Sequence, residues 1–184
     1  MNFLNTAIQM NLSKKLKRSG WVREKIKDSE SIADHCFGIT VFITLLSAQI
    51  GLNQERMVKM ALIHNFTAAV SEDIVAERGR TVLKKALKHK EKIQTNAMRS
   101  ILWEYGEEYG SVLREMNEKR TPEAKAFWQI DKLEMAVQAY LYEKEQKKNL
   151  KEFFENASGY IKHPVLREVF NDLMELRKHN FHSK

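Results

Sequence analysis

The chain has 184 residues, of which seven are Gly, two are Pro and one is Cys, and its formal net charge is +7. The scarcity of turn-forming residues favours an all-helical protein, and a single Cys excludes an intramolecular disulfide and indicates a reducing, cytoplasmic compartment. No stretch approaches the ~18 uninterrupted apolar residues of a membrane span, so we expect no membrane partner.

The positive charge raises the question of a nucleic-acid partner. The densest group of cations consists of Lys84, Lys85, Lys88, Lys90 and Lys92. No aromatic residues interleave with them, as they would in a platform that stacks bases. We therefore do not expect nucleic acid as the main partner, unless these lysines share one face with Arg78 and Arg80. A small molecule that carries a phosphate explains the positive charge more simply than nucleic acid does.

Apolar residues recur at helical spacing in the first 50 residues. The spacing predicts a first helix over residues 3–17, with the apolar positions Leu4, Ile8, Leu12 and Leu16. Gly20 is expected to end this helix, and a connector follows. A second helix is expected to have Asp28 or Ser29 as its N-cap and to end at Gly51. Its apolar stripe consists of Ile32, Cys36, Ile39, Ile43 and Leu46.

The rest of the chain continues the helical pattern. Further helices are expected over residues 54–69 and 81–105, from Pro122 to about Lys144, and after Pro164. Tyr105, Gly106 and Gly110 mark a turn, and Lys144 to Lys151 form a polar joint. Because no repeat, low-complexity segment or linker interrupts the pattern, we expect one compact helical bundle over residues 1–184.

Three residues of ligand type lie within these apolar segments. His35 lies near the start of one expected core helix, His64 towards the end of the next, and Asp131 amid a third. A lone His in an apolar helix is more often a packed core residue, but a buried Asp is costly unless it is paired or binds a ligand. Together the positions favour convergence on one polar point. Imidazole with carboxylate suits one divalent transition metal (Mn, Co, Zn, Fe or Ni), and such a metal with a bound water would form a hydrolytic site.

These three positions belong to longer segments that match a known family in order and spacing. The segments are Arg18 to Val22, Glu30 to His35, Met60 to Asn65, Asp73-Ile74, Glu123 to Met135, Gln138-Ala139, Tyr142-Glu143, Leu150 to Phe154 and His163-Pro164. In them the chain resembles the HD-domain phosphohydrolases, and in particular their small 5'-deoxynucleotidase branch. The similarity covers nearly the whole chain.

The resemblance implies a single HD domain of about five or six core helices, with peripheral helices, around one divalent metal. It also implies a homodimer that hydrolyses deoxynucleoside 5'-monophosphates to deoxynucleoside and phosphate. At the matching positions, His35, His64 and Asp131 correspond to metal ligands, and Asn65 stands at the fourth.

Three further residues match substrate-side positions of the branch. Arg18 is expected to meet the phosphate bidentately, and Trp21 to pack on the sugar or the base. Asp73 matches an acidic position beside the substrate. The alternatives are a solvated surface cation for Arg18, ordinary core packing for Trp21 and a helix N-cap for Asp73.

The chain departs from the family pattern in the active region. Asn65 replaces the paired Asp and brings no negative charge, so metal affinity is expected to fall. Ala68 stands where the branch has a proton-handling Glu, whose help is typically worth ~10²–10⁴ in rate. Glu72 is a candidate catalytic replacement, together with Asp73, although it could also point to solvent.

Two functions from different classes remain open. The first is a metal-dependent nucleotide phosphohydrolase with a weakened or rewired site. The second is a degenerate HD-domain protein that acts as a nucleotide-binding or regulatory module. Retention of the six matching residues favours the first. These residues are Arg18, Trp21, His35, His64, Asp73 and Asp131.

Overall fold

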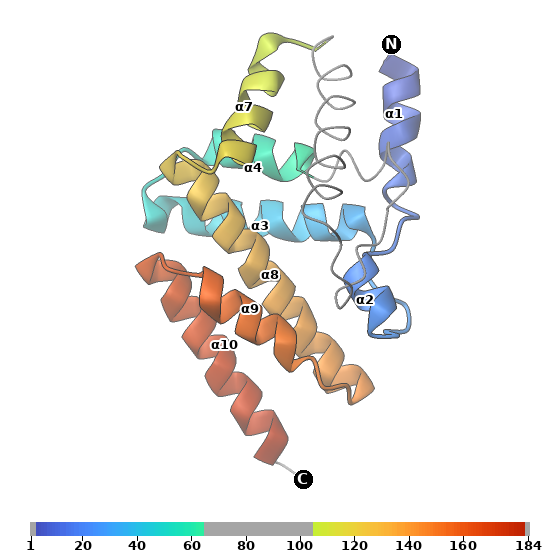
Figure 1. Cartoon of the computed structure of the whole chain (residues 1–184), viewed down its shortest axis with the longest axis vertical. Helices are drawn as coiled ribbons and strands as arrows, with labels where there is room; N and C mark the ends of the chain where they lie inside the picture. The colour runs from blue at the N-terminus through green and yellow to red at the C-terminus, as the bar shows by residue number, and fades with distance from the viewer. Residues whose placement is uncertain (1–2, 65–104, 183–184) are drawn as a thin grey trace, which may run out of the picture.

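The computed structural model describes residues 3–64 and 105–182, and every regular element within them is a helix. This confirms the expected all-α fold class. The helices are α1 (Phe3–Leu12), α2 (Ser19–Arg23), α3 (Ile32–Ile50), α4 (Gln54–Ile63), α7 (Glu107–Glu118), α8 (Pro122–Gln146), α9 (Lys151–Tyr160) and α10 (Pro164–His182), as Figure 1 shows. The basic helix expected over 81–105 and the end of the helix expected over 54–69 lie outside the described residues.

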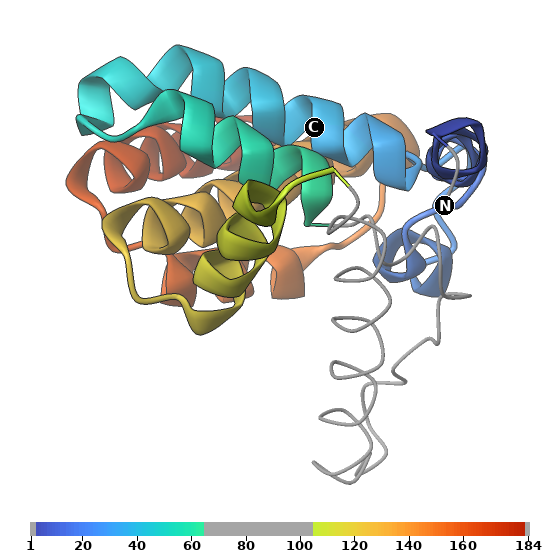
Figure 2. The same cartoon turned by 90° about the horizontal axis from the view of Figure 1, so that it is seen from above.

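The long helix α8 is the element around which the others are arranged. It contacts α3, α4 and α7 as well as α9 and α10. Seen from above, α3 and α4 run side by side as one layer over the C-terminal helices (Figure 2). Ile39 and Ile43 of α3, Met60 of α4, and Phe127 and Ile130 of α8 are completely buried between these helices. The inward faces of α3, α4 and α8 therefore form the core that positions the site.

The start of α3 is set by a capping box. The hydroxyl of Ser31, the N-cap, accepts a hydrogen bond from the Asp34 backbone N–H, and the Asp34 carboxylate accepts one from the Ser31 backbone N–H at 2.7 Å. The expected N-cap at Asp28 or Ser29 is therefore wrong by two or three residues, because Asp28 lies in a turn with a φ of +48°. The predicted end at Gly51 is confirmed, with a left-handed φ of +67°.

The N-terminal segment differs from its prediction. Helix α1 ends at Leu12 rather than near residue 17, and Leu4, Ile8 and Leu12 are 60%, 52% and 40% exposed, so this stripe is not part of the core. The chain then forms an isolated antiparallel bridge between Lys17 and Ser31. Gly20, expected to end the first helix, instead falls within the short helix α2.

The C-terminal half follows its prediction more closely. Helix α8 begins at Pro122 after the N-cap Thr121, as expected, and ends at Gln146. Gly110, expected in a turn, lies inside α7, whose N-cap is Gly106 with a φ of +122°. Helix α9 has no counterpart among the expected helices, because its two buried Phe residues are too few to give a clear periodic signal.

Helix α3 carries two large apolar residues on its outer face, beside the exposed polar residues Asp34, Thr44 and Gln49. By length and composition it would be able to cross a membrane, and it is the one such helix among the described residues. Its inner face is buried against α4 and α8. On its outer face, Phe37 is 70% and Leu45 67% exposed. These two side chains are available to contact a second apolar surface.

Replacing the N-cap of α3 tests how far the capping box holds this helix start. Ser31→Ala removes the acceptor for the Asp34 backbone N–H, so the free energy of unfolding is expected to fall by about 1 kcal/mol. Urea denaturation measures the change. Ser29→Ala, at the alternative N-cap position, is the matched control, and an equal effect of both variants would contradict the assignment of Ser31.

Candidate metal centre

Three helices bring His35, His64 and Asp131 together. His35 lies in the first turn of α3, His64 is the C-cap of α4, and Asp131 lies in the middle of α8. The His35 Nε2 atom is 3.1 Å from Asp131 Oδ1, and the His64 Nε2 atom is 3.9 Å from the same oxygen. All three side chains are at least 94% buried. The convergence expected from the sequence is therefore present.

The hydrogen bonds of the two His rings favour a ligand role for both Nε2 atoms. His64 Nδ1 is 2.8 Å from the Ala61 carbonyl oxygen, and His35 Nδ1 is 2.5 Å from Glu134 Oε2. An acceptor at Nδ1 places the ring proton there, which leaves the Nε2 lone pair for a cation.

The donor set fits a divalent cation. One ligand atom from each of His35, His64 and Asp131 can be chosen so that all lie within 4.8 Å of one another. Ligands bound at about 2.1 Å from one metal lie roughly 3–3.5 Å apart, close to the 3.1 and 3.9 Å separations observed. Two imidazoles and one carboxylate suit a transition metal rather than Ca²⁺.

Electrostatics favour the protonated form of His35 and the ionised form of Asp131. Burial and the Arg18 guanidinium lower the pKa of His35, but hydrogen bonds to Asp131 and Glu134 outweigh them, so the pKa of His35 is raised. Burial raises the pKa of Asp131, but the hydrogen bond from His35 and the charge of Lys132 outweigh it and hold this pKa well below its usual range. A metal that enters must therefore displace a proton from His35.

His64 behaves in the opposite way. Burial, followed by the charge of His35, lowers the pKa of His64 to about 3. His64 is therefore neutral near pH 7 and offers its lone pair without first losing a proton.

A second group of possible ligands lies on the other side of His35. It consists of Glu30, His35 and Glu134, all buried. Arg18 Nη1 lies among them, 3.1 Å from Glu30 Oε1, 2.7 Å from His35 Nδ1 and 3.8 Å from Glu134 Oε2. The guanidinium thus stands where a second cation would have to bind. Sequence reasoning missed Glu30 and Glu134; the signal for Glu134 was its spacing, one helical turn after Asp131.

Trp21 is a core residue with a polar contact. It is 1% exposed, its ring stacks on Phe153 at 4.4 Å, and Tyr142 meets it edge-on. Its Nε1–H donates to Glu30 Oε1 at 2.7 Å. The ring therefore has no exposed surface for the expected contact with a sugar or base, and Trp21 instead holds the carboxylate that pairs with Arg18.

The remaining expected site residues lie outside the described part of the chain. They are Asn65, Glu72 and Asp73, together with Ala68. Their predicted roles rest on the sequence alone.

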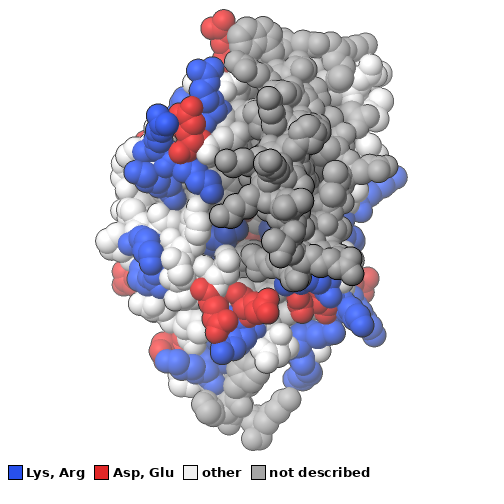
Figure 3. All heavy atoms as spheres, in the orientation of Figure 1, with Lys and Arg blue, Asp and Glu red and all other residues white. Residues whose placement is uncertain are grey.

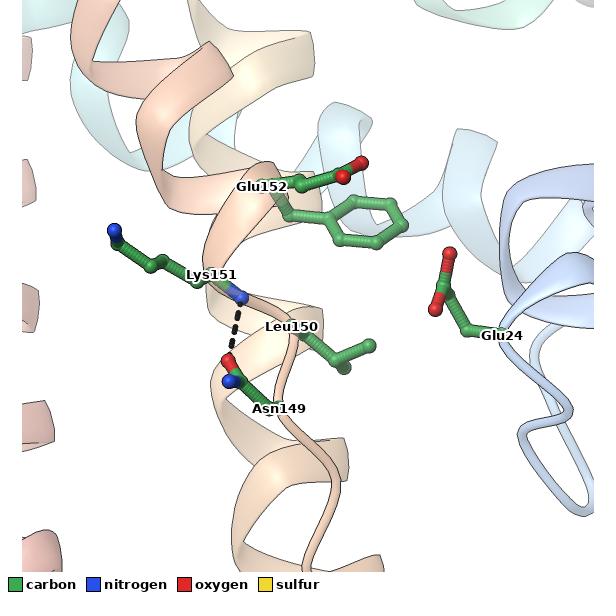
Figure 4. Close-up of a pocket in the computed structure, with 6 residues that line it drawn as sticks. Glu24, Asn149, Leu150, Lys151 and Glu152 are labelled. Carbon is green, nitrogen blue, oxygen red and sulfur yellow. Dashed lines mark hydrogen bonds between the residues drawn. The ribbon is translucent and has the colours of Figure 1, made fainter. Parts of the chain in front are cut away.

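Two surface hollows lie at the joint between α8 and α9. One, of about 210 Å³, is lined by Glu24 after α2 and by the start of α9 (Figure 4). There Glu24 faces the side of α9 that carries Glu152, while Lys151 points away. The other, of about 430 Å³, is lined mainly by exposed cations of the joint and α10. Neither hollow is lined by a residue of the His35 cluster.

The low pKa of His64 predicts a pH dependence of the metal-free protein. Between pH 6.5, its ordinary pKa, and about 3, the unfolded chain takes up a proton at His64 and the folded chain does not. The free energy of unfolding should therefore decrease as the pH is lowered through this range, by up to about 1.4 kcal/mol per pH unit from this group. Urea denaturation in chelator should give a smaller slope for His64→Gln, and equal slopes would contradict the prediction.

Comparison with known proteins identifies the family. The HD domain matches residues 10–173. The 5'-deoxynucleotidase HDDC2 of Danio rerio is 32% identical over 173 residues, or 89% of this chain and 82% of that protein. The 5'-deoxynucleotidase hdd1 of Schizosaccharomyces pombe is 31% identical over 171 residues, or 88% and 83%.

Two solved structures are similar to this chain in fold. A conserved hypothetical protein from Pyrococcus furiosus is similar with a TM-score of 0.78 and 26% identity, over 94% of this chain and 99% of that one. The PH0347 protein of Pyrococcus horikoshii has a TM-score of 0.77 and 29% identity, over 95% and 99%. The resemblance expected from the sequence is confirmed, and the chain belongs to the HD domain family, in its 5'-deoxynucleotidase branch.

Proposed function

We propose that the chain is a metal-dependent phosphohydrolase that converts deoxynucleoside 5'-monophosphates and water to deoxynucleosides and phosphate. The observation that carries the proposal is the convergence of His35, His64 and Asp131 in a member of the HD domain family. The relatives compared above are named 5'-deoxynucleotidases, which supports this substrate class.

The proposed metal site uses His35, His64 and Asp131, with the Asn65 amide oxygen as the fourth protein ligand. These residues would hold one divalent cation (Mn, Co, Zn, Fe or Ni), which would supply Lewis acidity towards the phosphoryl group and lower the pKa of a bound water molecule. Asp131 is the only carboxylate in this set, and its second oxygen is 2.8 Å from Lys132 Nζ. The site is therefore poor in negative charge, which supports weaker metal retention than an Asp at position 65 would give.

Arg18 is the proposed phosphate-binding residue. Its side chain is 20% exposed and contacts His35 Nδ1, the ring nitrogen that faces away from the proposed metal site. Glu30, fixed by Trp21, is the partner that keeps the guanidinium in place. The planar fork of Arg suits bidentate recognition of a phosphate. Binding there requires the guanidinium to leave His35 Nδ1, while its contact with Glu30 can persist.

The acid–base roles remain assigned from the sequence. Asp73 is proposed to lie beside the substrate and Glu72 to compensate for the missing Glu at position 68. If neither acts, the chain is the binding or regulatory module described above, which keeps the fold without turnover.

The proposal needs no nucleic-acid partner. On the face shown in Figure 3, the described Lys and Arg residues are dispersed and interspersed with Asp and Glu. On this face the described residues therefore form no continuous basic stripe of the kind that tracks a nucleic-acid backbone, and the lysines between 84 and 92 lie outside the described residues. The cytoplasmic location stays a prediction from the sequence.

Phosphate release provides the main test. With added Mn²⁺ or Co²⁺, the purified chain should release phosphate from deoxynucleoside 5'-monophosphates, and a chelator should stop the release. His64→Ala removes a metal ligand and should lower the rate by at least about 100-fold, in line with the importance of intact coordination. A colorimetric phosphate assay with metal analysis of each sample measures both effects.

Ala68→Glu is the informative counterpart, since it restores the proton-handling side chain of the branch. It should raise kcat by up to about 100-fold. Absence of metal and of release, in the wild type and also in an Asn65→Asp, Ala68→Glu double variant, would contradict the enzyme and leave the binding-module alternative.

We also propose that the chain acts as a homodimer, through the outer face of α3. Phe37 and Leu45 lie there with exposures of 70% and 67%, on the side opposite the buried Ile39 and Ile43. Exposed apolar patches of this kind commonly mark protein–protein interfaces. A second copy of α3 is the partner that matches an apolar face with an equally apolar one.

The dimer is tested by charge substitution on this face. Phe37→Asp with Leu45→Asp should convert a dimer into a monomer in size-exclusion chromatography with light scattering, because two carboxylates per chain would be buried unpaired. Leu176→Asp, at a 56% exposed position of α10, is the matched control and should leave the mass unchanged. A wild type that is monomeric, or a double variant that remains dimeric, would contradict the proposal.

A further inference from the structure

We propose that Glu134 is a positioning residue that orients His35 for metal binding, and that Gly38 is required to seat it. The inference rests on the proposed function, because it assigns a role behind the metal ligands of that site. Glu134 is not itself placed among the residues that touch the metal or the substrate.

The first observation is the contact between the two side chains. Glu134 Oε2 is 2.5 Å from His35 Nδ1, with His35 completely buried and the Glu134 side chain 7% exposed. Asp131 Oδ1 is 3.1 Å from Nε2 on the opposite side of the same ring. The ring is therefore held from both ends, and its rotation about χ2 would break both contacts.

The second observation is that the contact selects the ring tautomer. A carboxylate accepts but does not donate, so Glu134 keeps a His35 proton on Nδ1, and Nε2 is the ring nitrogen that can give up its proton to a metal. A partner of this kind at the distal nitrogen of a metal-binding His typically changes metal affinity 10- to 100-fold. Arg18 Nη1, 2.7 Å from the same Nδ1, cannot donate to a nitrogen that already carries this proton.

The third observation concerns the space around Glu134. A Cβ atom at Gly38 would lie 2.6 Å from Glu134 Oε1 and 3.1 Å from its Cγ. Real Cβ contacts are essentially never shorter than 3.0 Å. Gly38 lies one turn after His35 on α3. The absence of a side chain at this position therefore lets the Glu134 carboxylate reach His35 Nδ1.

Gly38 provides a test that separates positioning from stability. Gly38→Ala pushes the Glu134 carboxylate out of its place without removing a charge or a hydrogen-bonding group. Ala also favours the helix over Gly, so the helix itself is not weakened by the change. A purely structural role of Glu134 predicts no loss of metal affinity in this variant.

The experiment is a titration of the metal-free protein with Co²⁺ alone, followed by calorimetry and by the visible absorption of bound Co²⁺. We expect the Kd to rise about 10-fold in Glu134→Gln, which keeps an acceptor but not the charge, and about 100-fold in Glu134→Ala. Gly38→Ala should also bind Co²⁺ more weakly and change its absorption spectrum, while its helical content, measured by circular dichroism, equals that of the wild type.

The control is Glu143→Gln. Glu143 is a second buried carboxylate of α8, held by Arg177 at 2.7 Å and by the Leu150 backbone N–H at 2.8 Å, and it lies outside the cluster. This variant should lower the melting temperature and leave the Kd for Co²⁺ unchanged.

The two proposals fail in different ways. If the wild type binds Co²⁺ and Glu134→Gln and Gly38→Ala bind it equally well, the role of Glu134 is overturned and the metal site stands. If the wild type binds no Co²⁺, the proposed function is overturned, and the role of Glu134 falls with it.

Discussion

The proposed metal site depends on the two carboxylates of α8 that hold the His35 imidazole in one orientation. Asp131 and Glu134 are three residues apart on α8, so they lie one above the other on the face that α3 covers. They contact the two ring nitrogens of His35 at 3.1 and 2.5 Å. Burying two carboxylates is costly unless each has a partner. A register shift of α3 against α8 would leave both carboxylates without His35, so the polar cluster specifies the packing of these two helices.

The N-terminal segment adds a second layer to this arrangement. The bridge between Lys17 and Ser31 places Arg18 next to Glu30, and the backbone N–H of Arg18 donates to the Glu30 carbonyl oxygen at 3.3 Å. Trp21 in turn fixes the Glu30 carboxylate from the core side. The segment that resembles a substrate-binding motif thus contributes one residue able to face the phosphate and one that anchors it. The two residues face different ways because the short helix α2, which begins after Arg18, buries Trp21 in the core.

The sequence predicted the parts of the site that depend on residue type and helical order. His35, His64 and Asp131 were found because polar ligand types stand out within apolar segments. Glu134 was not singled out, because a Glu one turn from an Asp is also common on solvated helix faces. Its burial depends on the packing against Gly38, a tertiary contact that periodicity does not reveal. The apolar stripe of α1 is exposed for a related reason: helical spacing shows that a face is apolar and not which surface covers it.

Charge decides how well the proposed metal site would hold a cation with Asn65 in place of an acid. Asp131 is the only proposed ligand with a negative charge, and Lys132 offsets part of it from 2.8 Å. Glu134 places a further carboxylate directly behind His35, where it increases the electron density that the imidazole offers at Nε2. Its charge acts on the cation through the ring rather than by direct contact, so it strengthens binding without occupying a coordination position. A metal site with an amide at position 65 depends more on the charge of Glu134 than a site with two coordinating carboxylates would. Because Gly38 leaves the space that this carboxylate occupies, Gly38 contributes to metal affinity as well as to the packing of α3.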